Sequence, residues 1–249
     1  PRPLPIAGGE HAGSSDDFLY LPEPPGHITF IGGGYISMEF AGVAKAAGAE
    51  VTVLQRGERI MDRFDPDLVD ALQQSCAVRE IEIRTAVETQ SIDDLSLGDN
   101  TSRTGRRYAV RTVDTEGESE TIETDVVIAA LGRIPNIEEL DLDSAGVAAT
   151  RRGVRTDATM HTSAERVYAA GDCVEGIQLS PVSDAQARTA ARNIIADLAG
   201  AASPPTELDL STLPTVVFTY PQLAQFGIGE EEARERGNVR INTGSGALV

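Results

Sequence analysis

The sequence predicts an α/β fold in which a parallel sheet contains an antiparallel β-meander as one of its crossovers. A short apolar run at 27–31 ends in three glycines, a helical pattern follows at once, and a second apolar strand comes at 50–54. Short strands with polar alternation fill 87–123, and a further strand is expected from Asp125, whose continuous apolar run at 126–131 then ends at Gly132. Continuous apolar runs are typical of buried parallel strands, and polar alternation is typical of antiparallel ones. Together these patterns predict a Rossmann-like unit.

Three glycines, Gly32, Gly33 and Gly34, lie between the first strand and its helix. Gly32 can take the tight turn that a residue with a Cβ resists, and Gly34 leaves room for a diphosphate to approach the backbone. The next residues, Tyr35 and Ile36, open a helix whose free N–H groups attract anions. We therefore predict a dinucleotide-binding turn made by these five residues. A serine stands at the third position of G-x-G-x-x-G, and the alternative interpretation is a strand-to-helix turn without a ligand.

The end of the second strand carries no acidic residue at its tip. An Asp or Glu there would bind the ribose 2′-hydroxyl of NAD, whereas this chain has Gln55 followed by Arg56. A guanidinium is always charged and binds phosphate through two hydrogen bonds, so it suits the 2′-phosphate of NADP. We predict NADPH rather than NADH, with Gln55 and Arg56 at the site. Arg59 and Arg63 are candidates for further contacts to the 2′-phosphate, but the favoured interpretation of both is a solvated surface charge.

Composition narrows the classes of function. The 249 residues suffice for one large or two small domains, and a hydrophobic content of 41% supports a real core. A net charge of −18 argues against nucleic acid and anionic membrane surfaces as partners. No apolar run approaches the length of a membrane span, and the start at Pro1 has no signal-peptide pattern, so we expect a cytoplasmic location.

The basic residues are almost all arginines. Of the 21 basic residues only Lys45 is a lysine, while 39 residues are acidic. An excess of carboxylates with almost no lysine resembles proteins of salt-loving archaea, in which salt screens the self-repulsion. We therefore predict poor stability at low salt.

Cysteine and histidine patterns indicate no metal site. Cys76 and Cys173 are far apart in sequence and form no C-x-x-C pair, so neither a disulfide framework nor a metal site is expected. Cys76 lies in an amphipathic stretch and reads as a small buried hydrophobe. His11, His27 and His161 show no ligand spacing.

The remaining elements follow from local patterns. Asp65 followed by Pro66 is typical of a capped helix start, and we expect this helix to reach about Arg79. A strand at 166–171 is expected to end at Gly171, directly before Asp172. The other predicted elements are helices at 34–47, 181–198 and 230–236, strands at 81–83 and from 216, a short helical turn at 16–21, and a linker at 200–209.

Five segments spread over nearly the whole chain carry recognisable motifs. They are Gly32-Gly-Gly-Tyr-Ile-Ser-Met-Glu39, Ala130-Leu-Gly-Arg-Ile-Pro-Asn136, Tyr168-Ala-Ala-Gly-Asp172, Leu179-Ser-Pro-Val182 and Pro214-Thr-Val-Val-Phe-Thr219. In their sequence and their order, these segments together resemble the flavin-dependent pyridine nucleotide-disulfide oxidoreductases, such as glutathione reductase, mercuric reductase and dihydrolipoamide dehydrogenase.

The resemblance implies roles for particular residues. Tyr35 resembles the ring that shields the flavin until nicotinamide enters, and Glu39 the carboxylate near the flavin–nicotinamide contact. Gly132 resembles the backbone approach beside the pyridine nucleotide. Asp172 resembles the acid that binds the ribityl-phosphate region of FAD, and the helix from about Pro181 is expected to point its N-terminus at the flavin. Cofactor contacts are also expected from other members of the matched segments: Arg133, Gly171 and Leu179.

The resemblance also implies a division of the chain. Residues 1–24 would be a linker from an FAD domain, 25–149 the NAD(P) domain, 150–205 the C-terminal part of the FAD domain, and 206–249 the start of an interface domain. The FAD glycine motif, the redox cysteine pair and the His-Glu acid/base pair of that family are not found here. We therefore expect this chain to be an internal piece of a longer protein, one that binds nucleotide without completing a turnover. The full-length protein would be a homodimer that holds FAD.

Three functions remain open at this level. The favoured hypothesis is the NADPH-binding part of a reductase that passes hydride through FAD to a disulfide or mercuric ion. An NADH oxidase or ferredoxin reductase without the cysteine pair is a close alternative. A non-catalytic NAD(P)-sensing module is the third, although an acid facing a flavin, as expected of Asp172, would serve no purpose in it.

Overall fold

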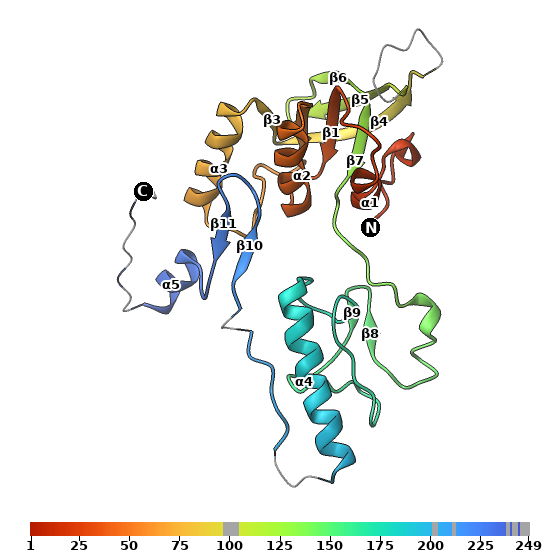
Figure 1. Cartoon of the computed structure of the whole chain (residues 1–249), viewed down its shortest axis with the longest axis vertical. Helices are drawn as coiled ribbons and strands as arrows, with labels where there is room; N and C mark the ends of the chain where they lie inside the picture. Colours follow the sequence, from red (N-terminus) through yellow and green to blue (C-terminus); the bar gives the residue numbers. More distant parts are fainter. Residues whose placement is uncertain (97–104, 201–203, 211–212, 238–239, 241–243, 245–249) are drawn as a thin grey trace. The chain divides into compact units, whose positions relative to one another are not determined.

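The computed structural model describes residues 1–96, 105–200, 204–210, 213–237, 240 and 244. These residues form two compact units (Figure 1), of which unit 1 comprises 1–132 and 215–249 and unit 2 comprises 133–214. Each unit is described below by itself.

A four-stranded parallel sheet forms the centre of unit 1. Its order is β3-β2-β1-β7, so the chain moves outward from β1 to β3 and then returns to the other side of β1. The predicted α/β fold is confirmed. The strands are β1 (His27–Ile31), β2 (Glu50–Leu54), β3 (Ile81–Arg84) and β7 (Val126–Ala129).

Two helices, α2 (Tyr35–Ala46) and α3 (Pro66–Val78), cover one face of this sheet (Figure 1). The predicted start of α3 is confirmed, because Asp65 caps it by accepting the N–H of Asp67. The core between helices and sheet includes the following buried residues: Ile28, Phe30, Met38, Ala41, Val51, Val53, Val69, Leu72 and Cys76.

The antiparallel meander packs on the opposite face of the sheet. It consists of β4 (Val87–Asp94), β5 (Tyr108–Asp114) and β6 (Ser119–Thr124), and it joins β3 to β7 as predicted. The core on this side contains Ile31, Leu54, Ile92, Tyr108, Val110, Ile122 and Val127. Because side chains alternate along a strand, neighbouring residues of β1 are buried in different cores, which explains its continuous apolar run.

The first 24 residues belong to unit 1 and pack against its sheet, its meander and α2. They contain a 3₁₀ turn, η1 (Gly9–His11), and a short helix, α1 (Ser15–Leu19). A single β-bridge ties Ala7 to β4, and the ring of Phe18 stacks on Phe40 of α2 at a centroid distance of 4.3 Å.

The later part of unit 1 adds a small hairpin and a helix. The hairpin pairs β10 (Thr215–Val217) with β11 (Leu223–Gln225), and the helix is α5 (Glu230–Arg236). Val217 and Leu223 belong to the same core as α2 and α3. The hairpin is therefore attached to the helical face of the sheet.

Unit 2 is organised around one long helix, α4 (Ser180–Leu198). It also contains a 3₁₀ turn, η2 (Glu138–Leu140), and the short antiparallel pair β8 (Ala149–Thr150) and β9 (Gly153–Val154).

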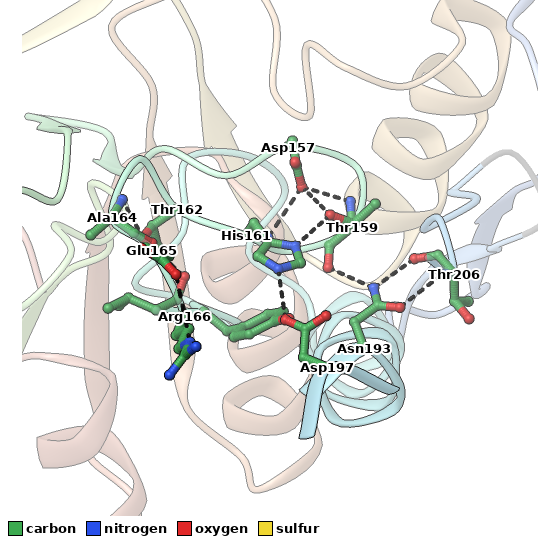
Figure 2. Close-up of polar contacts among 12 residues, drawn as sticks. Asp157, Thr159, His161, Thr162, Ala164, Glu165, Arg166, Asn193, Asp197 and Thr206 are labelled. Carbon is green, nitrogen blue, oxygen red and sulfur yellow. Dashed lines mark hydrogen bonds and ion pairs between the residues drawn. The ribbon is translucent and has the colours of Figure 1, made fainter. Parts of the chain in front are cut away.

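Side-chain hydrogen bonds tie the loops of unit 2 to α4 (Figure 2). The buried Asn193 of α4 donates to the carbonyls of Thr159 and Thr206, both at 2.8 Å, and accepts the N–H of Thr206. Asp157 accepts hydrogen bonds from the main chain of Thr159 and His161. One asparagine thus holds two loop segments on the same helix.

The prediction of a strand at 166–171 is wrong. Within the described residues this segment makes only one bridge, between Tyr168 and His161, and Arg166 has a left-handed φ of 63°. A β-strand needs a partner along its length to satisfy its backbone groups, whereas the described neighbour of this segment is only the short stretch 160–162, through the bonds of Thr162 to Val167 and of Ala169 to Met160.

Candidate functional site

A groove of about 280 Å³ lies at the carboxyl ends of β1, β2 and β7. These ends meet where the chain direction reverses from β1–β2–β3 to β7, which is the place where ligands bind in open α/β sheets. We call it the glycine groove. Its lining residues are Gly32, Gly33, Gly34, Tyr35, Ile36, Gln55, Met61, Asp62, Ala130, Leu131 and Gly132.

Each of the three positions 32–34 requires or allows glycine for a different physical reason. Gly32 has a φ of +104°, and a Cβ on it would lie 2.7 Å from the carbonyl oxygen of Ala130. A Cβ on Gly33 would lie 2.6 Å from a methyl of Ile60. At Gly34, by contrast, a Cβ would meet no described atom within 4 Å. The first two glycines are thus required by the fold, whereas Gly34 leaves open space at the start of α2.

The N–H groups of the glycine turn differ in whether they are bonded within the protein. The N–H of Gly33 donates to Oε1 of Gln55 at 3.0 Å, because the Gln55 side chain folds back over the turn. Within the described part of the chain, the N–H groups of Gly34 and Ile36 make no hydrogen bond to protein. They belong to the first turn of α2, where intrahelical acceptors are missing and the helix dipole is positive.

The two arginines nearest to β2 differ in their surroundings. Arg59 donates to the carbonyl of Pro66 and pairs with Asp70 of α3, so its charge is used within the protein. Arg56 is exposed and has no ion-pair partner among the described residues. It does not line the glycine groove, but it lies one residue beyond Gln55, which does.

Glu39 lies one turn further along α2. Its half-buried carboxylate accepts the N–H of Phe218, beside β10, at 2.9 Å. Tyr35 is 38% exposed at the rim of the groove. The structure thus brings Tyr35 together with the glycines in one groove, whereas Glu39 contacts the backbone of the β10–β11 hairpin.

A second set of predicted site residues lies in unit 2. The N–H of Gly171 donates to Gln186 of α4 at 2.8 Å, and the exposed Asp172 accepts the hydroxyl of Ser183, in the first turn of α4, at 3.3 Å. Leu179 is the residue before that helix. Asp172 and the positive end of a 19-residue helix are thus neighbours. Arg133 is an exposed residue at the beginning of unit 2.

Several groove residues were not predicted from the sequence. Asp62 brings a carboxylate to the wall of the groove, and Met61 reaches it through a strained left-handed backbone with a φ of 50°. Both lie in the segment between β2 and α3, and no motif marks them. Phe218 was missed as the partner of Glu39, because the two are 179 residues apart.

The described lining of the groove contains neither cysteine nor histidine. Both cysteines are free, and burial raises the pKa of the Cys76 thiol, which fits a packing role. Among the residues that the structure describes, no group of His, Cys, Asp and Glu is arranged to hold a metal ion. Within the same residues, no helix is both long and apolar enough to cross a membrane.

Unit 1 therefore has the architecture of a Rossmann-like α/β protein, with its groove at the switch point of the sheet. Residues 1–187 match the family described as pyridine nucleotide-disulphide oxidoreductase. The chain belongs to this family.

Individual relatives agree with the assignment. The chain is 33% identical over 225 residues to a mercuric reductase of Staphylococcus aureus, covering 90% of this chain and 38% of the relative. It is 33% identical over 244 residues to a glutathione reductase of Burkholderia cepacia, covering 96% and 50%. It is 32% identical over 240 residues to a dihydrolipoyl dehydrogenase of Staphylococcus aureus, covering 95% and 48%.

Solved structures show the same fold. The Cu(II) complex of the HOCl-induced flavoprotein disulfide reductase RclA from Escherichia coli superposes with a TM-score of 0.77 at 28% identity, covering 94% of this chain and 50% of that one. The chain thus spans about half the length of the relatives it matches, or less.

Proposed function

We propose that unit 1 binds NADPH in the glycine groove, as the nucleotide-binding part of an FAD-dependent oxidoreductase that reduces a disulfide or a mercuric ion. The observation that carries this proposal is the position of the groove at the switch point of the sheet, beside the N-terminus of α2. The N–H groups of Gly34 and Ile36 would receive the diphosphate, since both the open backbone and the helix dipole favour an anion there.

The preference for NADPH is supported by the end of β2. Gln55 offers no carboxylate to a ribose 2′-hydroxyl, and Arg56 keeps an unpaired charge next to it. A charge-assisted hydrogen bond to a 2′-phosphate contributes about 1.5–3 kcal/mol, or about a 10- to 150-fold preference.

The residues of unit 2 support the flavin part of the proposal. Asp172 and the first turn of α4 offer an acceptor for ribityl hydroxyls and donors for a phosphate, which fits the middle of an FAD molecule. When bound, FAD supplies the two-electron relay between NADPH and the disulfide or metal substrate. Gly171, Leu179, Gly132 and Arg133 complete the proposed cofactor contacts.

Tyr35 and Glu39 are the residues that we assign to the nicotinamide end. Tyr35 lies at the groove rim with part of its ring exposed, so it can cover a ring beside it and swing aside when nicotinamide enters. Glu39 has one carboxylate oxygen on the N–H of Phe218, and its acceptor capacity exceeds this one bond. The names of the relatives support reduction of a disulfide or mercuric substrate, and a cytoplasmic homodimer goes with this proposal.

Calorimetric titration of the chain with NADPH and with NADH tests the proposal. NADPH should bind the more tightly, and Arg56→Ala should remove at least about tenfold of NADPH affinity while leaving NADH unchanged. The matched control is Arg111→Ala, which removes an exposed arginine that pairs with Asp93 on the meander. Tighter binding of NADH, or absence of binding by either nucleotide, would contradict the proposal.

A further inference from the structure

The side chain of Gln55 connects two parts of unit 1 that are separate in sequence. Its Oε1 accepts the N–H of Gly33 at 3.0 Å, and its Nε2 donates to the carbonyl oxygen of Arg59 at 3.0 Å. The two partners fix the orientation of the amide, because an N–H requires the oxygen and a carbonyl requires the nitrogen. Gln55 therefore bridges the glycine turn and the loop that follows β2.

Main-chain bonds strengthen the same connection. The N–H of Met61 donates to the carbonyl of Gly33 at 2.9 Å, and the N–H of Ala86 donates to the carbonyl of Gly57 at 2.9 Å. The loop at 55–61 is thus held at both of its ends and at its centre. Among the described residues, the side-chain hydrogen bond from this loop to Gly33 is the one that Gln55 makes, and the side chain of Ile60 packs beside Gly33 without a hydrogen bond.

Arg56 lies inside this loop, between Gln55 and the Arg59 carbonyl to which the Gln55 side chain donates. Its guanidinium has no ion-pair partner in the described part of the chain, so the conformation of the loop backbone is the main constraint on its position that the structure shows. Loosening the loop would spread the guanidinium over more positions. Every ordered contact to a 2′-phosphate would then cost more conformational entropy.

We infer that Gln55 is a positioning residue that sets the preference for NADPH through Arg56, and not by touching the nucleotide itself. The inference rests on the proposed function. In this view the Gly33 N–H stays bonded to Gln55, and the N–H groups that follow Gly33 bind the diphosphate. A glutamine at the end of β2 therefore has two effects. It provides no carboxylate for a ribose 2′-hydroxyl, and it holds the 55–61 loop, which carries Arg56, against the glycine turn.

The test is a double-mutant cycle of Gln55→Met and Arg56→Ala, with NADPH and NADH affinities measured by calorimetry. Methionine keeps the unbranched shape but cannot make either hydrogen bond. We expect Gln55→Met to lower the NADPH-to-NADH affinity ratio about fivefold while NADH affinity changes less than about twofold. In the Gln55→Met background, Arg56→Ala should cost several-fold less NADPH affinity than in the unchanged chain.

Gln90→Met is the matched control, because Gln90 lies on β4 and its side chain contacts only the exposed Glu88 among the described residues. It should leave the affinity ratio unchanged. If methionine disturbs folding, as judged by thermal unfolding, Gln55→Ala removes the same bonds with less bulk. Additive effects in the cycle, or an equal loss of both nucleotides, would overturn the inference. Absence of NADPH binding by the unchanged chain would instead contradict the proposed function.

Discussion

Asp62 places a carboxylate on the wall of the glycine groove, where the proposed ligand carries several negative charges. It is exposed and makes no ion pair among the described residues, so its charge is not compensated by the protein. Two like unit charges about 4 Å apart in water repel by about 1 kcal/mol. The groove thus combines anion-attracting backbone with one opposing side chain.

We predict that Asp62→Asn tightens NADPH binding about three- to fivefold at low salt, because it removes this repulsion without changing the shape of the side chain. Calorimetry at two salt concentrations would measure it, and the gain should shrink as salt screens the charge. Glu58→Gln is the control, since Glu58 lies on the same loop but does not line the groove. Unchanged or weaker binding by the Asp62 variant would show that this carboxylate faces away from the ligand.

In unit 2, the carboxylate of Asp197 at the end of α4 accepts the hydroxyl of Tyr168. Nε2 of His161 lies 3.3 Å from the same carboxylate oxygen, and Figure 2 shows His161 and Asp197 facing each other. The Tyr168 hydrogen bond, followed by His161, lowers the pKa of Asp197. Burial, followed by the bond to Asp197, raises the pKa of Tyr168 to about 12. Both shifts favour the pair of an ionised acid and a neutral phenol.

The signs of these shifts give a pH prediction. The contribution of Asp197 to stability is present above its ordinary pKa of 3.8 and is lost as the pH falls through its lowered value in the folded protein. The contribution of Tyr168 is complete below its ordinary pKa of 10.0 and is lost as the pH rises through about 12. We expect Asp197→Asn to flatten the loss of stability below about pH 4, measured as the urea midpoint against pH.

Glu165→Gln is the control for this experiment, because Glu165 is an exposed acid whose only described partner is the exposed Arg166. It should leave the acid limb of the curve unchanged. An identical acid limb for Asp197→Asn and the unchanged chain would mean that the bond between Tyr168 and Asp197 does not persist in solution.

The β10–β11 hairpin is the element whose attachment bears most directly on Glu39. Three polar contacts hold its first half: the N–H of Phe218 on Glu39, the Ser75 hydroxyl on the carbonyl of Tyr220 at 3.0 Å, and the guanidinium of Arg79 at 3.6 Å over the Tyr220 ring. An isolated two-stranded hairpin is marginal, so it depends on these contacts and on its two core residues.

Removing the cation–π contact should therefore loosen the hairpin before it affects the sheet. We predict that Tyr220→Leu raises hydrogen exchange at Phe218 and along β10 about two- to fivefold, since an exposed cation–π pair contributes about 0.5–1 kcal/mol. Exchange in β1 and β2 should not change. Arg236→Ala, which breaks an ion pair within α5, is the control. Equal acceleration in the sheet and the hairpin would contradict the local attachment.

Local patterns predicted the elements of unit 1 well, because the signals for each helix or strand lie within the residues that form it. Asp65 and Pro66 marked the start of α3 through capping chemistry, and the positive φ of Gly32 follows from its turn. The 166–171 segment has the composition of a strand, but a strand also needs a partner, which composition does not supply. The bond between Gln55 and Gly33 spans 22 residues and depends on one rotamer, so no sequence pattern could reveal it.

On the scale of the whole molecule, charge is the dominant feature. A net charge of −18 on 249 residues means that acidic side chains outnumber basic ones and repel one another on average. The thirteen ion pairs among the described residues use mostly exposed side chains, each of which contributes little in water. The free energy of unfolding should therefore depend on the ionic strength more than on any single pair.

We predict that the melting temperature rises steadily between about 0.05 M and 2 M potassium chloride, because the Debye length falls from about 10 Å at 0.1 M to about 3 Å at 1 M and screens the repulsion. Scanning calorimetry of the chain would measure this. A matched variant with glutamine at Glu116, Glu118, Glu231 and Glu235 removes four exposed negative charges and should lose part of the salt dependence. If both chains show the same salt dependence, the rise in melting temperature comes from salt strengthening apolar burial and not from charge screening. A melting temperature that does not respond to salt would contradict the self-repulsion.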